Sequence, residues 1–127
     1  MKLSELMIGD WVYVEKFGKP IRVESVGYTA FVGYEHFQEI DGSICGIKPI
    51  ELTEEILEKN GWILKEFGCH KQFQYSFEDY GTEIVLKIDY EKTNFIVSFF
   101  RATFELKYVN ELQHMLKLCG IEKEIVL

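Results

Sequence analysis

The sequence has few of the features that would cross-link a small fold or anchor it in a membrane. Its 127 residues include only two prolines and three cysteines, Cys45, Cys69 and Cys119, with no CxxC pair. An odd, scattered set of thiols argues against a disulfide framework and favours a reducing, cytoplasmic location. Apolar runs are only a few residues long, against the ~20 that a membrane span needs. Glu5 and Asp10 interrupt the start of the chain, so neither a signal peptide nor a membrane partner is predicted.

Recognisable catalytic and metal-binding motifs are also missing. The ten glycines form neither a GxGxxG nor a GxxxxGK[ST] loop, and no GxSxG occurs. His36, His70 and His114 are far apart and show no HxH or HExxH spacing. Cys69 adjoins His70, but neighbours in an extended segment point to opposite faces, so adjacency alone makes no thiolate–imidazole pair. The sequence therefore predicts no catalytic residue, no metal site and no cofactor.

Basic residues are in the minority. Fourteen Lys and Arg stand against 21 Asp and Glu, which gives a formal net charge of −7. Proteins that bind duplex DNA need cations to displace counterions from phosphate, so this balance argues against a nucleic-acid partner. A local patch remains open, because net charge does not forbid one. Lys16, Lys19 and Arg22 are the nearest basic set in the first third of the chain, and Glu15 and Glu24 dilute it.

Apolar and aromatic residues are plentiful, and their spacing indicates an α+β protein. The apolar fraction is 47% and the aromatic fraction 15%. Residues 1–48 alternate in short stretches broken by glycine, which predicts strands over 11–17, 21–25, 30–40 and 43–47. The third strand is expected to bend at Gly33, and Asp41-Gly42 is expected to turn a hairpin. Short, bent strands of this kind predict a small SH3-like β-barrel.

Residues 49–127 are expected to form an α+β subdomain that makes one compact unit with the barrel. A helix should begin after Thr53, a favoured N-cap, and end at Gly61 in the left-handed conformation. Strands of an antiparallel sheet are predicted over 62–67, 71–77, 84–88 and 95–100. The expected order is therefore helix, antiparallel sheet, second helix and terminal strand, with the sheet packed against both helices.

The second helix is predicted over 107–118, with Gly120 as its C-terminal cap, followed by a terminal strand over 121–127. Its apolar stripe consists of Tyr108, Leu112, Met115, Leu116 and Cys119. Its solvated side is expected to consist of Asn110, Glu111, Gln113, His114 and Lys117.

The function most consistent with these features is a non-catalytic protein-interaction or accessory role with an unknown protein partner. Tyr28, Tyr34 and His36 are the predicted binding residues, since they flank breaks at which a barrel loop would present aromatic rings. A nucleic-acid-binding small-barrel module is the alternative. An enzyme would need a site assembled only by folding, for example from Cys69, His70, Glu78 and Asp79. The protein is expected to be a monomer or a homodimer.

Three segments together resemble a known family. The segments are Leu6-Met7-Ile8-Gly9-Asp10-Trp11-Val12, residues 49–57 followed by Asn60-Gly61-Trp62, and Lys107-Tyr108-Val109-Asn110-Glu111-Leu112-Gln113. Over nearly its whole length the chain is similar to an uncharacterised family of short proteins from prophage and mobile-element regions of gut anaerobic bacteria. That family has no assigned catalytic or binding residues. The resemblance therefore implies a context only, namely a cytoplasmic accessory gene product.

Overall fold

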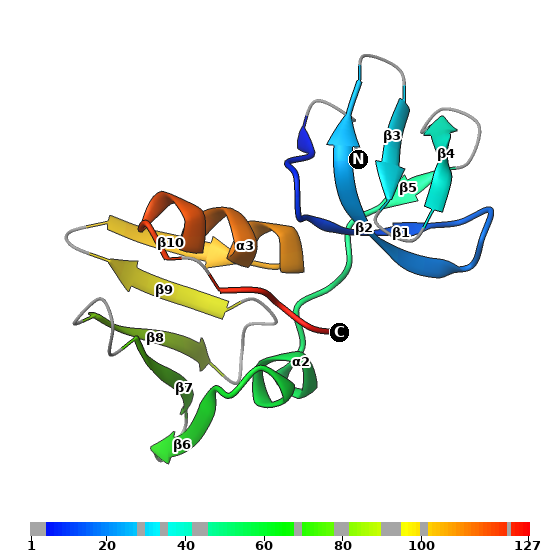
Figure 1. Cartoon of the computed structure of the whole chain (residues 1–127). Coiled ribbons are helices and arrows are strands. Elements are labelled where there is room, and N and C mark those ends of the chain that lie inside the picture. The colour runs from blue at the N-terminus through cyan, green and yellow to red at the C-terminus, as the bar shows by residue number, and fades with distance from the viewer. Residues whose placement is uncertain are drawn as a thin grey trace. The chain divides into compact units, whose positions relative to one another are not determined.

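The chain is an α+β protein that divides into two compact units. The computed structural model describes residues 5–27, 30–33, 36–41, 46–67, 70–77, 82–89, 95–99, 102–121 and 123–127. Over these residues it has two five-stranded antiparallel sheets and two helices (Figure 1), which confirms the predicted fold class. The first unit comprises Met1–Glu51 and Tyr108–Leu118, and the second comprises Leu52–Lys107 and Cys119–Leu127.

The first unit is built on a sheet with the strand order β4-β3-β2-β1-β5. Its strands are β1 (Trp11–Val14), β2 (Lys19–Val26), β3 (Ala30–Gly33), β4 (His36–Asp41) and β5 (Ile47–Lys48). The first four follow one another as a meander, and β5 returns to pair with β1. No closed barrel is formed by the described residues of this sheet, whose edges are β4 and β5.

Alternation along β1 and β2 puts one face of this sheet into an apolar core. Val12 and Val14 on β1 are fully buried, and their register partners on β2 are Ile21 and Lys19. Because successive side chains point to opposite faces of a strand, Tyr13, which lies between these valines, faces the other way. The buried cluster consists of Leu6, Val12, Val14, Ile21, Val23, Ile40 and Ile47.

One prediction for this sheet is wrong, and another falls mostly outside the described residues. The single strand predicted over 30–40 is two strands, β3 and β4, and Gly33 pairs with His36 in antiparallel register. The hairpin predicted at Asp41-Gly42, with its return strand over 43–47, involves residues 42–45, which lie outside the described residues. At the described end of that segment, Ile47 of β5 pairs with Val14 of β1 and is buried beside the β1 core.

The helix α3 (Val109–Leu118) belongs to this first unit. The sequence interpretation grouped it with residues 49–127 instead. Its predicted apolar stripe is confirmed for Leu112, Met115 and Leu116, which are buried. The predicted solvated side is wrong at Asn110 and Gln113, since both are buried as well.

The second unit begins with α2 (Glu54–Lys59), whose two ends form as predicted. The Thr53 hydroxyl accepts a hydrogen bond from the Ile56 N–H at 3.3 Å, which satisfies one of the helix's free donors. At the other end Gly61 has φ +86°, and the Gly61 N–H donates to the Glu58 carbonyl oxygen while the Trp62 N–H donates to that of Leu57. This pair of bonds is a Schellman motif, which requires the left-handed residue supplied by Gly61.

The second sheet is antiparallel, as predicted, with the strand order β10-β9-β8-β7-β6 (Figure 1). The sequence predicted four of its strands, and β10 was missed. Its strands are β6 (Ile63–Phe67), β7 (His70–Phe77), β8 (Thr82–Asp89), β9 (Phe95–Phe99) and β10 (Ala102–Leu106). Phe73 of β7 and Phe95 of β9 are buried and meet edge to face, with ring centroids 6.0 Å apart. Such an aromatic contact across β8 joins both sides of the meander into one core.

The terminal strand predicted over 121–127 is not formed by residue 121 or by residues 123–127. Ile121 and Ile125 are nevertheless buried. The Asn60 side chain binds this segment in place of a neighbouring strand. Asn60 Oδ1 accepts from the Val126 N–H and Asn60 Nδ2 donates to the Val126 carbonyl oxygen, both at 2.7 Å. One side-chain amide thus satisfies both backbone groups of Val126.

Candidate binding surface

Of the three predicted binding residues, the structure describes only the backbone of His36. Tyr28 and Tyr34 lie outside the described residues. His36 is the first residue of β4, and its backbone pairs with Gly33, but its side chain also lies outside the description. The assignment of these three residues as a binding site therefore stays a prediction.

The outer face of β1 carries an exposed aromatic residue that sequence reasoning did not select. Tyr13 lies between the buried Val12 and Val14 and is 37% exposed. The strand register places Pro20 of β2 on one side of Tyr13 and Lys48 of β5 on the other. Directly paired residues of antiparallel strands share a face, so these three side chains form a row across the outer face.

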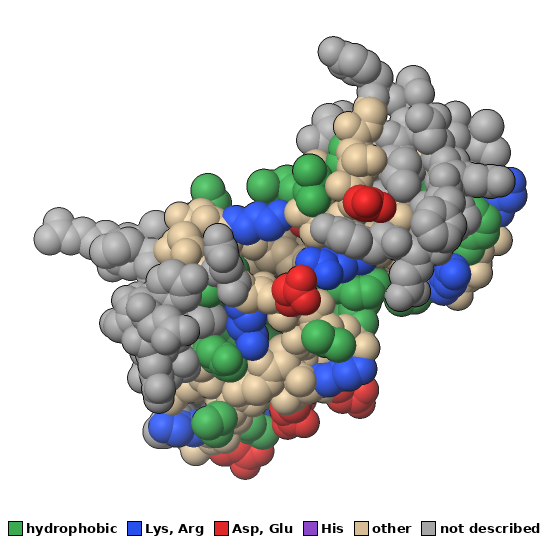
Figure 2. All heavy atoms as spheres, in the orientation of Figure 1, with side chains coloured by type: hydrophobic (Ala, Val, Ile, Leu, Met, Phe, Trp, Pro, Cys, Tyr) green, Lys and Arg blue, Asp and Glu red, His purple; other side chains and the backbone are tan. Residues whose placement is uncertain are grey.

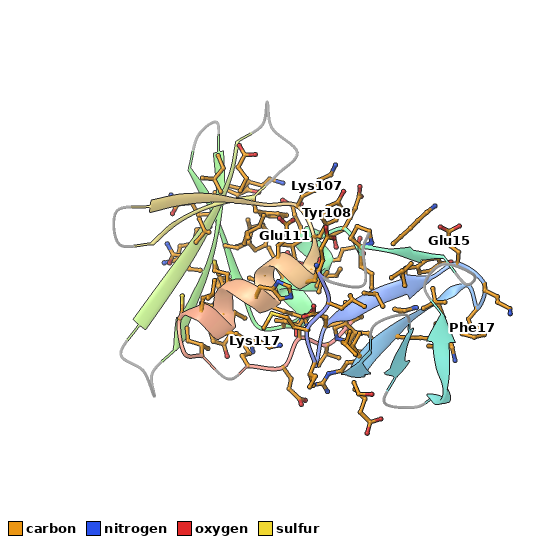
Figure 3. All side chains as sticks on the ribbon, turned by 90° about the horizontal axis from the view of Figure 1, so that it is seen from above. Glu15, Phe17, Lys107, Tyr108, Glu111 and Lys117 are labelled. Carbon is orange, nitrogen blue, oxygen red and sulfur yellow. The ribbon has the colours of Figure 1, made fainter. Side chains whose placement is uncertain are left out.

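A second aromatic residue lies at the end of the same hairpin. Phe17 occupies the turn between β1 and β2 and is 38% exposed. The turn is closed by hydrogen bonds from the Phe17 and Gly18 N–H groups to the Val14 carbonyl oxygen, at 3.2 and 2.9 Å. A Cβ built on Gly18 would lie 3.8 Å from Tyr13 Oη, so Tyr13 reaches this turn. Figure 3 shows Phe17 and Glu15 at this end of the first sheet.

Three lysines lie on this hairpin or on the strand beside it. Lys16, Lys19 and Lys48 are exposed, and Figure 2 shows basic and apolar side chains side by side at this tip of the sheet. Lys48 Nζ lies 3.5 Å from Glu15 Oε1 with both side chains about half exposed or more, which makes this a weak surface ion pair. We call the set Tyr13, Phe17, Pro20, Lys16 and Lys48 the Tyr13 surface. Lys19 is not a member, because it pairs with the buried Val14 and so lies on the other face of the sheet.

Sequence reasoning missed this surface for an identifiable reason. The alternation of Trp11 and Tyr13 predicted the first half of the strand expected over 11–17, but β1 ends at Val14 and Phe17 lies in the turn. Lys16 and Lys19 were recognised as part of a local basic set. The missing member was Lys48, which reaches Tyr13 only because β5 pairs with β1. Lys48 is 35 positions from Tyr13 in the sequence, so no local pattern could bring the two together.

A second polar cluster fastens α3 to the segment before β1. The Asp10 side chain is fully buried, and its Oδ2 lies 2.7 Å from Nε2 of His114 and accepts from the Met7 N–H at 2.8 Å. Beside it, Gln113 Oε1 accepts from the Trp11 N–H at 3.0 Å and Gln113 Nε2 donates to the Gly9 carbonyl oxygen at 2.8 Å. The Gln113 amide thereby bonds the backbone at the start of β1, beyond the residues that pair with β5, as a neighbouring strand would. This role explains why Gln113 is buried.

A buried carboxylate that orients an imidazole is also a component of catalytic triads, so its surroundings matter. The His114 side chain is 27% exposed, and Asp10 is its hydrogen-bond partner. Within the described ranges, no hydroxyl or thiol bonds to its other ring nitrogen. The Met7 N–H bonds the same carboxylate, and the Gln113 amide bonds the backbone at Gly9 and Trp11, so these contacts position α3. The geometry therefore supports a fastening role for Asp10 and His114.

The remaining chemically notable residues form no second site in the described part of the chain. Cys69 lies outside the described residues, and only the backbone of its neighbour His70 is described. Cys119 is a free thiol, and burial raises its pKa. The described histidine, cysteine and acidic side chains include no group of three able to hold a metal ion.

Comparisons with known proteins return no match, whether with protein-family models, with curated proteins or with solved structures. Neither described helix has the length and apolar character required to cross a membrane. The functional argument therefore rests on the geometry of the Tyr13 surface.

Proposed function

We propose that this protein is a non-catalytic protein-interaction module, and that it acts as a cytoplasmic accessory protein of a prophage or mobile element. The observation that carries the interaction role is the exposure of Tyr13 and Phe17 at one hairpin. Large aromatic rings supply much of the binding energy in protein interfaces, because they bury a large area at a low cost in conformational entropy. Burial of both rings and of Pro20 against a partner would remove this apolar surface from water.

We further propose that the first unit is an SH3-like small barrel. Two features of β2 support this. Its first half, Lys19–Arg22, pairs with β1, whereas Val23, Ser25 and Val26 pair with β3. The register shifts between Val23 and Ser25, which is the kind of irregularity that bends a strand. A long, bent strand shared by two halves of a sheet, with a fifth strand returning to the first, is the arrangement that a half-open small barrel requires.

Nucleic-acid binding is the second candidate. Rings beside lysines are also the components of single-strand binding surfaces, in which bases stack and cations contact phosphate. Here the Tyr13 surface offers Tyr13, Phe17 and two lysines, Lys16 and Lys48, within a chain of net charge −7. The net negative charge of the chain would repel a long polyanion such as a nucleic acid, so this candidate is placed second.

The interaction role can be tested by affinity capture with surface variants. Tagged wild-type protein, the double variant Tyr13→Ser/Phe17→Ser and a control, Ile63→Ser/Leu118→Ser, would be exposed to a lysate of the source organism. The control also removes two exposed apolar side chains, neither of which belongs to the Tyr13 surface. Each captured protein would be identified by mass spectrometry, purified and tested again for direct binding.

We expect a partner that binds the wild type and the control but not the Tyr13/Phe17 variant, with all three folded by circular dichroism. A partner that binds all three equally would show that the Tyr13 surface is not the interaction site. Absence of any directly binding protein would overturn the proposed function.

A further inference from the structure

Residues 119–127 are a separate piece of the second unit. The helix α3 before them belongs to the first unit, whereas Cys119–Leu127 belongs to the second together with Leu52–Lys107. Residue 121 and residues 123–127 form no strand, so this part of the chain does not extend the second sheet. It docks on residues that lie far from it in the sequence, and its docking place has the character of a binding site.

The backbone of this segment is bound by a side chain that α2 holds in place. Asn60, the C-terminal cap of α2, accepts from the Val126 N–H and donates to the Val126 carbonyl oxygen, both at 2.7 Å. Asn60 Nδ2 also donates to the Ile56 carbonyl oxygen at 2.7 Å, which fixes the orientation of the amide. The Val126 side chain is 53% exposed, so the amide recognises the backbone at this position rather than the side chain.

Other side chains of the same segment supply its selectivity. Ile121 and Ile125 are both 3% exposed and lie four positions apart. Between them, Lys123 Nζ lies 4.4 Å from the ring centroid of Tyr75 on β7 and donates to the Tyr75 hydroxyl at 3.3 Å. A segment with two apolar residues four positions apart and a cation midway therefore matches this place. We call Asn60 and Tyr75 the Asn60 site.

We propose that the Asn60 site binds residues 121–127 of a second copy of this chain, so that two copies exchange these segments and form a symmetric dimer. Each described contact of the segment is retained in the exchange, because an identical segment fills an identical site. The inference goes beyond the proposed function, since no residue of the Tyr13 surface takes part.

Gly120 provides a point at which the chain can change direction. Only Cys119 and Gly120 separate the end of α3 from the buried Ile121. Gly120 has φ +74°, and no described atom beyond its chain neighbours lies within 4 Å of a Cβ built on it. The space on that side is thus open, and a residue without a Cβ leaves the left-handed region for an extended conformation at little cost. The segment can then reach its own site or that of a second copy.

Protein concentration decides between the two arrangements. Within one copy the two-residue connection keeps the segment near its site, at an effective concentration on the order of 1 mM. Between copies the same contacts form at the actual protein concentration. Chains that fold together at ~1 mM should therefore form the exchanged dimer, whereas chains that fold at ~10 µM should remain mainly monomeric.

Light scattering after size-exclusion chromatography tests the exchange on the full chain. The wild type and three variants would be refolded from urea at ~10 µM and ~1 mM, with folding checked by circular dichroism. Ile125→Ser removes a buried side chain of the segment, and Val126→Ser, its matched control, removes the exposed side chain next to it. Gly120→Val leaves the docking contacts intact but strains the left-handed backbone of the monomer.

We expect the dimer fraction of the wild type to be at least about fivefold larger at ~1 mM than at ~10 µM. Ile125→Ser should lower the fraction at ~1 mM at least about fivefold, and Val126→Ser should change it less than about twofold. Gly120→Val should raise the fraction at ~10 µM at least about threefold, because the exchanged form relieves the strain. A wild type that is monomeric at both concentrations, a dimer that Ile125→Ser retains, or a Gly120→Val variant with no more dimer than the wild type would overturn the assignment.

Discussion

Nε2 of His114 on α3 lies 2.7 Å from Oδ2 of Asp10, although 104 positions separate the two residues in the sequence. The Asp10 carboxylate is fully buried, and its Oδ1 has no hydrogen-bond partner among the described residues. His114 and the Met7 N–H therefore provide the described stabilising contacts of this carboxylate. The pair makes the position of α3 depend on the segment that precedes β1.

A double-mutant cycle measures this dependence. Asp10→Ala and His114→Ala should each lower the free energy of unfolding by about 1–3 kcal/mol, because each removes a buried hydrogen bond. The coupling energy should be about 0.5 kcal/mol or more, since the two side chains contact each other. As a control, Glu24→Ala removes an exposed carboxylate and should combine additively with His114→Ala. Additive effects of Asp10→Ala and His114→Ala in urea denaturation would contradict the fastening role.

Two leucines of α3 offer a matched test of its buried face. Leu112 is fully buried, whereas Leu118 is 89% exposed. Leu112→Ala should therefore lower the free energy of unfolding by about 2–5 kcal/mol, because it leaves a cavity in a packed interior. Leu118→Ala should change it by less than about 0.5 kcal/mol. Chemical denaturation of both variants checks this, and equal effects would place the buried face of α3 elsewhere.

The Asn60 side chain is expected to hold the segment around Val126. It is buried and makes hydrogen bonds to both backbone groups of Val126, as well as a 2.7 Å bond from Nδ2 to the Ile56 carbonyl oxygen. Asn60→Ala should cost about 1–3 kcal/mol and should speed hydrogen exchange of the Val126 amide at least about fivefold. Glu58→Ala, at an exposed position of the same helix, should leave that amide unchanged. Unaltered exchange in Asn60→Ala would mean that other contacts hold the segment.

Cys119 should react slowly with alkylating reagents. Burial disfavours the charged thiolate and raises the pKa of this thiol, so its thiolate fraction near neutral pH is smaller than that of a free thiol. In a Cys45→Ser/Cys69→Ser background, iodoacetamide should modify Cys119 more slowly than it modifies glutathione, and the rate should rise as the pH is raised. Unfolding in urea should remove the difference. Modification of the folded protein at the rate of glutathione would contradict the burial.

Local signals predicted the parts of the fold that local interactions decide. The two ends of α2 were predicted correctly from Thr53 and Gly61, because capping involves residues only a few positions apart. The antiparallel strands β6 to β9 follow from alternation and from short connections between sequential strands, whereas β10 was not predicted. The return of β5 to β1 was missed, since it depends on the long-range burial of Ile47 beside Val14.

Side chains that act as backbone partners were the other features beyond sequence reasoning. Gln113 was expected in solvent because its position follows the polar side of the α3 pattern. Its side-chain amide instead bonds the Trp11 N–H and the Gly9 carbonyl oxygen at the start of β1. Asn60 lies next to the predicted helix end at Gly61, but nothing in the sequence indicated that its side chain bonds Val126. At the candidate site, Tyr13 and Phe17 were recognised as part of a strand pattern only. Their exposure beside Lys48 emerged from the strand register.

The most direct test of the interaction role is photo-crosslinking from position 17 in cells of the source organism. A photoreactive phenylalanine analogue would replace Phe17, and in a control it would replace the exposed Ile63 of the second unit. We predict a discrete adduct with one identifiable protein from position 17, absent from position 63 and lost when Tyr13→Ser is added. No adduct from position 17, or the same adducts from both positions, would contradict the account.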